Sequence, residues 1–163
     1  MKRSELLELL NLSTFTAFDF ETTGLDSSQD RVIEVAAIRF ENGEITEKFV
    51  QLINPEKKIS AMITRLTGIS NKMVRNAPTE EMVIDDLLGF IGKSPLVAHN
   101  IHFDQNFLIK MCERLGRDVP KFERYDTLQL ARTLFFQQPV FNLGALSEYF
   151  GLSSEGSHRA EKD

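Results

Sequence analysis

The sequence predicts a single α/β domain in which helices flank a mixed β-sheet of about five strands. Three strand-like segments come first and follow one another closely, which is typical of an antiparallel meander. After them, short strands alternate with helical segments, which favours parallel pairing across the connecting helices. The length of 163 residues fits one domain with one substantial core.

The opening meander is predicted from three segments rich in β-forming residues: 14–20, 32–40 and 45–53. Asn42 and Gly43 lie between the second and third segments, and Asn-Gly is the strongest short-range signal for a hairpin. Pro55 follows the third segment and is expected to end it, because proline has no N–H for a further ladder bond.

The remainder of the chain is predicted to alternate helices with short strands at residues 95–98 and 124–126. Thr79 is a suitable N-cap residue, and Gly92 and Gly116 stand where helices are expected to end. The predicted helices cover residues 1–12, 60–67, 70–76, 79–91, 103–115, 127–136 and 142–151, with the first turn of a further helix at the end of the chain.

Composition and charge restrict the function classes. The net charge of −5 argues against a protein that grips long nucleic acid by neutralising phosphates, but it suits an enzyme that handles one chain end. No apolar run approaches the length of a membrane span, so no membrane association is expected. Cys112 is the only cysteine, so no intrachain disulfide is possible and a cytoplasmic location is expected. Because Cys112 falls on the apolar stripe of a predicted helix, we expect its thiol to be buried.

Two acids, Asp19 and Glu21, lie in the stretch FDFETTGLD near the end of the first predicted strand. Because side chains alternate along a strand, both leave one face about 7 Å apart, while Phe18 and Phe20 point to the other face. Two acids on an apolar strand are costly unless they are solvated, paired or bound to a metal. The alternative is a strand that ends at Phe18, with the acids at the start of a solvated loop.

Asp104 lies in the first turn of the predicted helix 103–115. One interpretation is a carboxylate that complements the helix dipole. The other is a site residue, because sites collect beyond the C-terminal ends of strands in α/β sheets. His99, directly after the strand, is expected to make structural hydrogen bonds. Asp126, at another strand-to-helix junction, is interpreted as an N-cap first and a site residue second.

His158 and Asp163 close the chain in the stretch HRAEKD. Composition alone favours a solvated polar tail, whereas a histidine in a loop followed by an acid on a helix would allow both to converge. Together, the separated acids and the histidine predict a site that holds hard divalent metals and moves protons. Such a site points to two-metal hydrolysis of a phosphodiester.

The stretches FDFETTGLD, AHNIHFDQNFL and HRAEKD, in this order, resemble the DnaQ-like exonucleases of the DEDDh type, a family named for four acids and a histidine. The stretches ITRLTGIS, DTLQLAR and NLGALSEYFG are similar to its connecting segments. The resemblance runs from residue 14 to Asp163. It implies an RNase H-like fold and a 3′→5′ exonuclease activity similar to that of the proofreading domain of DNA polymerase III.

The resemblance also implies a role for each matching residue. Asp19, Glu21 and Asp163 would coordinate a first Mg²⁺ or Mn²⁺ ion. Asp19 would bridge to a second ion, held by Asp104 directly or through water. His158 would be the general base. The pocket for the terminal nucleotide would be lined by Thr22, Thr23, Gly24, Leu25, His99, Asn100 and Phe103.

Members of the family continue through a C-terminal helix, so we expect this exonuclease domain to lack that helix, since the chain ends at Asp163. The expected substrate is the 3′ end of single-stranded DNA, in replication proofreading. A DNA polymerase subunit or further domains of a longer chain are the expected partners. Two alternatives are an RNA-trimming exonuclease similar to RNase T and a nuclease-fold module without catalysis.

Overall fold

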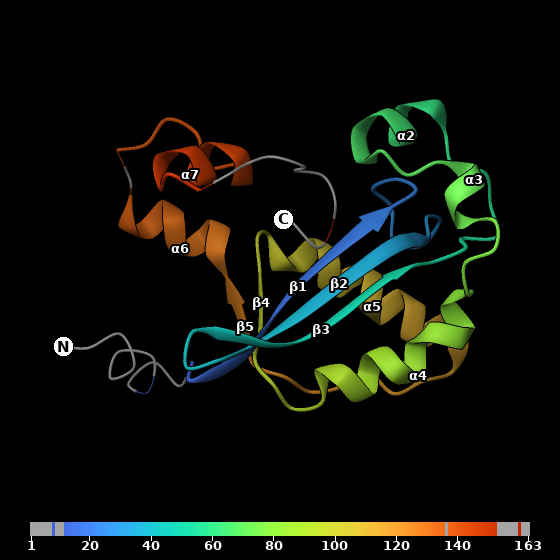
Figure 1. Cartoon of the computed structure of the whole chain (residues 1–163), viewed down its shortest axis with the longest axis horizontal. Coiled ribbons are helices and arrows are strands. Elements are labelled where there is room, and N and C mark those ends of the chain that lie inside the picture. Colours follow the sequence, from blue (N-terminus) through green and yellow to red (C-terminus); the bar gives the residue numbers. More distant parts are fainter. Residues whose placement is uncertain (1–7, 9–11, 136, 153–159, 161–163) are drawn as a thin grey trace.

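The computed structural model describes residues 8, 12–135, 137–152 and 160, and it confirms the predicted α/β architecture. The strands have these bounds: β1 Thr14–Thr22, β2 Val32–Glu41, β3 Glu44–Leu52, β4 Leu96–Ala98 and β5 Arg124–Asp126. They form one five-stranded sheet in the order β3-β2-β1-β4-β5 (Figure 1). The first three strands pair antiparallel, whereas β4 and β5 run parallel to β1. The helices predicted at the two chain ends fall almost entirely outside the described residues.

A tight hairpin joins β2 to β3 at the predicted Asn-Gly pair. Asn42 and Gly43 have φ values of 53° and 86°, the left-handed values that a type I′ turn requires at both central positions. Glu41 and Glu44 pair directly across this turn. The local sequence therefore sets the register of the long antiparallel half of the sheet.

One face of the sheet is covered by two helices, α4 (Glu80–Ile91) and α5 (Ile101–Leu115) (Figure 1). Phe18 and Phe20 of β1 point into this layer and meet edge to face, with ring centroids 4.7 Å apart. They share a core with buried side chains of both helices, including Ile84, Leu87, Phe107, Leu108 and Cys112. The intervening residues of β1 therefore face the other side of the sheet.

The described part of the chain also contains four shorter helices: α2 Ala61–Thr67, α3 Asn71–Val74, α6 Thr127–Leu134 and α7 Leu143–Tyr149. Helices α2 and α3 belong to a second core cluster that includes Ile33, Ile63 and Val74. Helix α5 begins earlier than predicted because Asn100 takes a left-handed conformation at its N-cap position, with φ of 65°. Across the described part of the chain, no helix is both long enough and apolar enough to cross a membrane.

A β-bulge distorts the pairing of β1 with β2 at the end where the acids lie. Glu21 pairs with Glu34. The next pair is Thr22 with Val32, so Ile33 has no partner on β1. The extra residue packs into the second core cluster, while Glu34 stays opposite Glu21. Bulges commonly re-aim side chains next to active sites.

The second face of the sheet, together with the α6–α7 region, bounds an apolar groove of about 570 Å³. Ala17, Ala36 and Ile38 line it from the sheet. Among the described residues that line the groove, Asp19 and His99 are the ionisable ones. The groove therefore brings an acid of β1 and the residue after β4 to one surface.

Candidate active site

The predicted pair of acids on β1 lies on the face of the sheet opposite the main core. Along β1, Phe18 and Phe20 are buried, whereas Asp19 and Glu21 are partly buried. The strand continues to Thr22, so the acids belong to it and do not begin a solvated loop. This confirms the prediction that both acids lie on the strand, and the alternative of a strand that ends at Phe18 is wrong.

Asp104 lies in the first turn of α5 and is only 2% exposed. Its Oδ1 accepts a hydrogen bond of 2.9 Å from the backbone N–H of Phe20, the residue between the two acids of β1. Strand β4 pairs with β1 only as far as Ala17 and Val97, so this N–H lies beyond the parallel strand. The interpretation of Asp104 as a helix-dipole residue is therefore incomplete, because its carboxylate also continues the hydrogen bonding along β1.

Three carboxylates influence one another here. Burial raises the pKa of the Asp104 carboxyl well above its usual range, and the negative charges of Asp19 and Glu21 raise this pKa further. The hydrogen bond from the Phe20 N–H opposes this shift, because it stabilises the charged form. A bound cation would relieve the repulsion, and such perturbed acids are typical of functional sites.

Glu34 is a buried acid that the sequence analysis missed. It is 1% exposed and lies directly opposite Glu21 on β2. Cross-strand partners share a face with Cβ atoms about 4.5–5.5 Å apart, so a fourth carboxyl group lies beside the strand acids. Its Oε2 accepts a hydrogen bond of 3.0 Å from the backbone N–H of Ala160. The available signal was an acid inside the apolar run VIEVAA, where a charge is costly without partners.

The predicted residues His158 and Asp163 lie outside the described residues. Ala160, which stands between them in the sequence, is described and buried. It lines the apolar groove together with Asp19 and Ala36. The C-terminal segment therefore reaches the acidic face at this point, and the roles of His158 and Asp163 stay predictions.

The chemistry of the acids suits a hard divalent cation. Asp19, Glu21 and Asp104 offer only carboxylate oxygens, which Mg²⁺ and Mn²⁺ prefer. Within the described ranges, no three acidic, histidine or cysteine side chains are arranged to hold a metal ion by themselves. The predicted set also includes Asp163, and Mg²⁺ usually combines few protein ligands with water and substrate phosphate oxygens. The described acids therefore fit such an ion as part of a larger ligand set.

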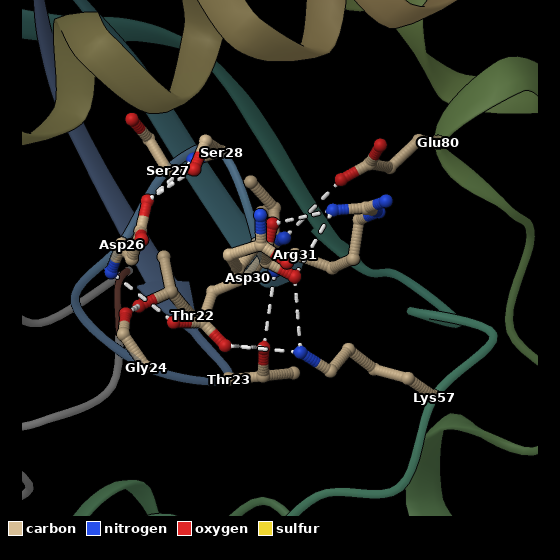
Figure 2. Close-up of polar contacts among 12 residues, drawn as sticks. Thr22, Thr23, Gly24, Asp26, Ser27, Ser28, Asp30, Arg31, Lys57 and Glu80 are labelled. Atoms are coloured by element: carbon tan, nitrogen blue, oxygen red, sulfur yellow. Dashed lines mark hydrogen bonds and ion pairs between the residues drawn. The ribbon is translucent and has the colours of Figure 1, made fainter.

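The end of β1 and the loop that follows it carry four of the predicted nucleotide-pocket residues, Thr22, Thr23, Gly24 and Leu25, and this loop folds around Asp30 (Figure 2). Thr22 Oγ1 donates to the Gly24 carbonyl at 2.6 Å. Thr23 Oγ1 donates to Asp30 Oδ1 at 3.0 Å, and the Asp26 N–H donates to Asp30 Oδ2 at 3.1 Å. These contacts fix the backbone directly beyond the acids of β1.

Gly24 is partly buried in this loop, whereas the next residue, Leu25, is exposed. A Cβ on Gly24 would lie 2.3 Å from Asp30 Oδ2, so only glycine fits while that carboxylate holds its place. Lys57 donates to Asp30 Oδ1 at 3.1 Å and so ties the loop to the segment after β3 (Figure 2). Burial raises the pKa of Asp30, but its hydrogen bonds, first among them that from Lys57, bring it below the ordinary value. Leu25 is 87% exposed and is free to contact a ligand.

His99 lies at the end of β4, where the sequence predicted a structural histidine. Its Nδ1 is 3.1 Å from Thr127 Oγ1. Burial lowers the pKa of the imidazole, although a backbone hydrogen bond with Phe141 and the charge of Asp126 act in the opposite direction. The ring is therefore neutral near pH 7 and connects β4 to α6.

Asp126 acts as the predicted N-cap of α6. Its Oδ1 accepts hydrogen bonds from the N–H groups of Leu128, at 2.9 Å, and Asn100, at 3.0 Å. The second contact, which the sequence did not predict, joins the start of α6 to the turn between β4 and α5. Phe103 in α5 packs against Phe107 with ring centroids 5.0 Å apart. The contacts of His99, Asn100 and Phe103 thus hold these three predicted nucleotide-pocket residues in place.

The five-stranded mixed sheet, with acids gathered at the C-terminal end of its central strand, defines an RNase H-like fold. A family model described as exonuclease (RNase_T) matches residues 16–163. The chain therefore belongs to this exonuclease family and forms an exonuclease domain. The match begins inside β1 and confirms the resemblance to the DnaQ-like exonucleases.

Curated relatives include an exonuclease and a polymerase. The 3′-5′ exonuclease DinG of Bacillus subtilis (strain 168) is 40% identical over 155 residues, which are 94% of this chain and 17% of the relative. A DNA polymerase III PolC-type protein of Caldanaerobacter subterraneus subsp. tengcongensis is 39% identical over 149 residues, which are 91% of this chain and 11% of the relative. This chain thus spans only a small part of the length of either relative.

Solved structures with the same fold include exonuclease I of Escherichia coli. Its zinc-bound complex with single-stranded DNA superposes with a TM-score of 0.83 at 22% identity, over 93% of this chain and 38% of that one. Apo exonuclease I gives a TM-score of 0.77 at 21% identity, over 86% of this chain and 38% of that one. At this identity the likeness establishes the fold.

Proposed function

We propose that this domain is a metal-dependent 3′→5′ exonuclease that removes nucleoside 5′-monophosphates from the ends of single-stranded DNA. The observation that carries the proposal is the convergence of Asp19 and Glu21 with the buried Asp104, whose pKa their charges raise. The relative named as a 3′-5′ exonuclease supports the direction of hydrolysis. The polymerase relative and the DNA-bound exonuclease I support DNA as the substrate.

The residues that would hold two divalent cations, Mg²⁺ or Mn²⁺, are Asp19, Glu21, Asp104 and Asp163. When bound, such ions stabilise charge on the attacking and leaving oxygens of a phosphodiester. The protein contributes the fixed position of the ligands. The Phe20 N–H orients the Asp104 carboxylate, and the geometry of β1 sets the spacing of the other acids.

Other residues of the chain are proposed to accept the proton of the attacking water and to bind the terminal nucleotide. His158 would accept the proton of the attacking water, because an imidazole with an ordinary pKa is largely neutral above about pH 6.5. The terminal nucleotide would lie between the loop after β1, which Asp30 holds in place, and the segment after β4. The residues that would line this pocket are Thr22, Thr23, Gly24, Leu25, His99, Asn100 and Phe103. Exposed Leu25 offers an apolar surface for a base.

The proposed context is proofreading in DNA replication, which the 39% identity to a PolC-type polymerase supports. The 40% identity to DinG supports an alternative context outside a polymerase chain. A primer terminus distinguishes the two contexts. A proofreading enzyme should remove a mispaired 3′ terminus faster than a paired one, and equal rates would favour the alternative.

A ladder assay tests the proposed reaction. Matched DNA and RNA oligomers labelled at the 5′ end are incubated with Mg²⁺, Mn²⁺ or EDTA. We expect DNA to shorten one nucleotide at a time with either metal ion, and to stay intact in EDTA. Asp19→Asn is the inactive control, because it keeps the shape of the side chain and removes the charge.

Three results would contradict particular parts of the proposal. Full activity in EDTA would exclude the metal ions. Cleavage of a circular single strand at the rate of the linear one would exclude an exonuclease. Faster shortening of RNA than of DNA would make RNA the substrate.

A further inference from the structure

The buried contact between Glu34 and Ala160 joins β2 to the C-terminal segment. Glu34 Oε2 accepts a hydrogen bond of 3.0 Å from the Ala160 N–H, across 126 positions of the chain. Both residues are buried. Because a buried backbone N–H is costly without a partner, this carboxylate fixes the path of the backbone at Ala160.

Packing holds Ala160 at the same place. Its side chain lines the apolar groove together with Asp19 and Ala36, which are partners across β1 and β2. Ala160 is 3% exposed, so the methyl group is enclosed. A hydrogen bond and a packed side chain therefore locate one residue of the C-terminal segment directly beside the strand acids.

We propose that Glu34 is a positioning residue of the active site, which fixes the backbone at Ala160 beside the acids of β1. This inference rests on the proposed function, which assigns the proton to His158 and a metal ion to Asp163. His158 is two positions before Ala160 and Asp163 is three positions after it. Loss of the contact at Ala160 is therefore expected to impair the steps that the proposed function assigns to these two residues.

The location of Glu34 supports an anchoring role over a purely structural one. Like charges directly opposite each other on a sheet are unfavourable, and Glu34 lies opposite Glu21. An apolar side chain in this apolar run would avoid that repulsion. An apolar side chain would also leave the Ala160 N–H without its acceptor, so a side chain with an acceptor oxygen is needed at this position.

Two variants separate the acceptor oxygen from the charge. Glu34→Gln keeps an oxygen that accepts the Ala160 N–H, whereas Glu34→Ala removes it. Glu34→Ala should speed hydrogen exchange of the Ala160 amide by about tenfold. It should lower kcat by about 10–100-fold with little change in KM, the usual effect of losing a residue that orients ligands. Glu34→Gln should retain the exchange protection and most of kcat.

Glu80→Ala is the matched control. Glu80 is also buried, accepts the Val32 N–H at 3.2 Å and pairs with Arg114 at 2.9 Å. Its removal should lower the melting temperature without changing exchange at Ala160 or kcat. In a His158→Ala background, Glu34→Ala should cost less than it does in the wild type, because the two residues act together.

The outcomes separate this inference from the proposed function. If Glu34→Ala leaves Ala160 exchange and kcat unchanged in an active enzyme, the positioning role is overturned and the proposed function stands. If Glu34→Gln keeps the protection but loses Mn²⁺ affinity and kcat as fully as Glu34→Ala, Glu34 is a metal ligand and the inference is overturned. A wild-type protein without nuclease activity would overturn the proposed function. Hydrogen exchange of the Ala160 amide would still show whether Glu34 holds the backbone at Ala160.

Discussion

Asp104 on α5 accepts a hydrogen bond of 2.9 Å from the backbone N–H of Phe20 on β1, across 84 positions of the chain. Phe20 separates Asp19 from Glu21, so the contact brings a buried carboxylate beside two others. The charges of both neighbours raise its pKa. We expect the repulsion among these acids to affect the stability of the protein and its affinity for a cation.

Asp104→Asn should stabilise the metal-free protein near pH 7. The asparagine keeps an oxygen for the Phe20 N–H but carries no charge. Because the folded-state pKa of Asp104 is raised, its contribution to stability is present at low pH and is lost as pH rises through that pKa. In EDTA, the melting temperature of the variant should exceed that of the wild type at pH 7. The difference should shrink toward about pH 4. A variant that melts below the wild type in EDTA at pH 7 contradicts this account.

Gly24→Ala should weaken substrate binding, because its Cβ would displace the Asp30 carboxylate that holds the loop. We expect KM for single-stranded DNA to rise about tenfold with a smaller change in kcat. Gly89→Ala is the matched control, since a Cβ there meets nothing within 4 Å. That control should stabilise α4 by about 0.5–1 kcal/mol and leave KM unchanged. Equal KM values for both variants and the wild type would show that the loop does not contact substrate.

Asp126→Ala should act on stability. It removes the cap of α6 and the acceptor of the Asn100 N–H, and should cost about 1–2 kcal/mol. For a domain of this size that corresponds to a fall of about 2–8 °C in melting temperature, with kcat nearly unchanged. Asp126→Asn keeps an acceptor oxygen and should recover most of the loss. Reduced turnover at an unchanged melting temperature would instead place Asp126 in the reaction.

His158→Ala should lower kcat by about 10²–10⁴-fold, the usual value of a positioned general base. In the wild type, kcat should rise between about pH 6 and 8 as the imidazole loses its proton, and the variant should lose this rise. Affinity for Mn²⁺ should change little, because the carboxylates remain. His102, which is exposed on α5, provides the control: His102→Ala should keep the full pH profile. If kcat of His158→Ala still rises between about pH 6 and 8, another group accepts the proton of the attacking water.

The antiparallel half of the sheet was predictable because its determinants are local. Asn42 and Gly43 specify the hairpin, and the alternation of Phe18 and Phe20 with Asp19 gives the two faces of β1. Helix ends were predicted less accurately. The start of α5 depends on a left-handed Asn100 whose N–H is held by Asp126, a contact that no local pattern indicates.

The burial of Asp104 and the position of Glu34 could not be predicted in this way. The contact between Asp104 and Phe20 depends on where β4 stops beside β1, which is a tertiary property. Glu34 faces Glu21 because the pairing of β1 with β2 keeps one register from Thr14 and Glu41 to this point, and no local sequence pattern indicates which residues of two strands become partners. The sequence therefore indicated Asp19, Glu21 and Asp104 as candidate site residues, but not how the fold holds them.

Calorimetric titration of the metal-free protein with Mn²⁺ tests most directly whether the acids form one divalent-ion site. Wild-type protein and Asp104→Asn are titrated near pH 7 in buffers of different ionisation enthalpy, which reveals proton release. We predict that the wild type binds Mn²⁺ and releases a proton, because the cation replaces the proton favoured by the raised pKa of Asp104. Asp104→Asn should bind at least about tenfold more weakly and without that release. Binding by Asp104→Asn with wild-type affinity and the same proton release would contradict the account.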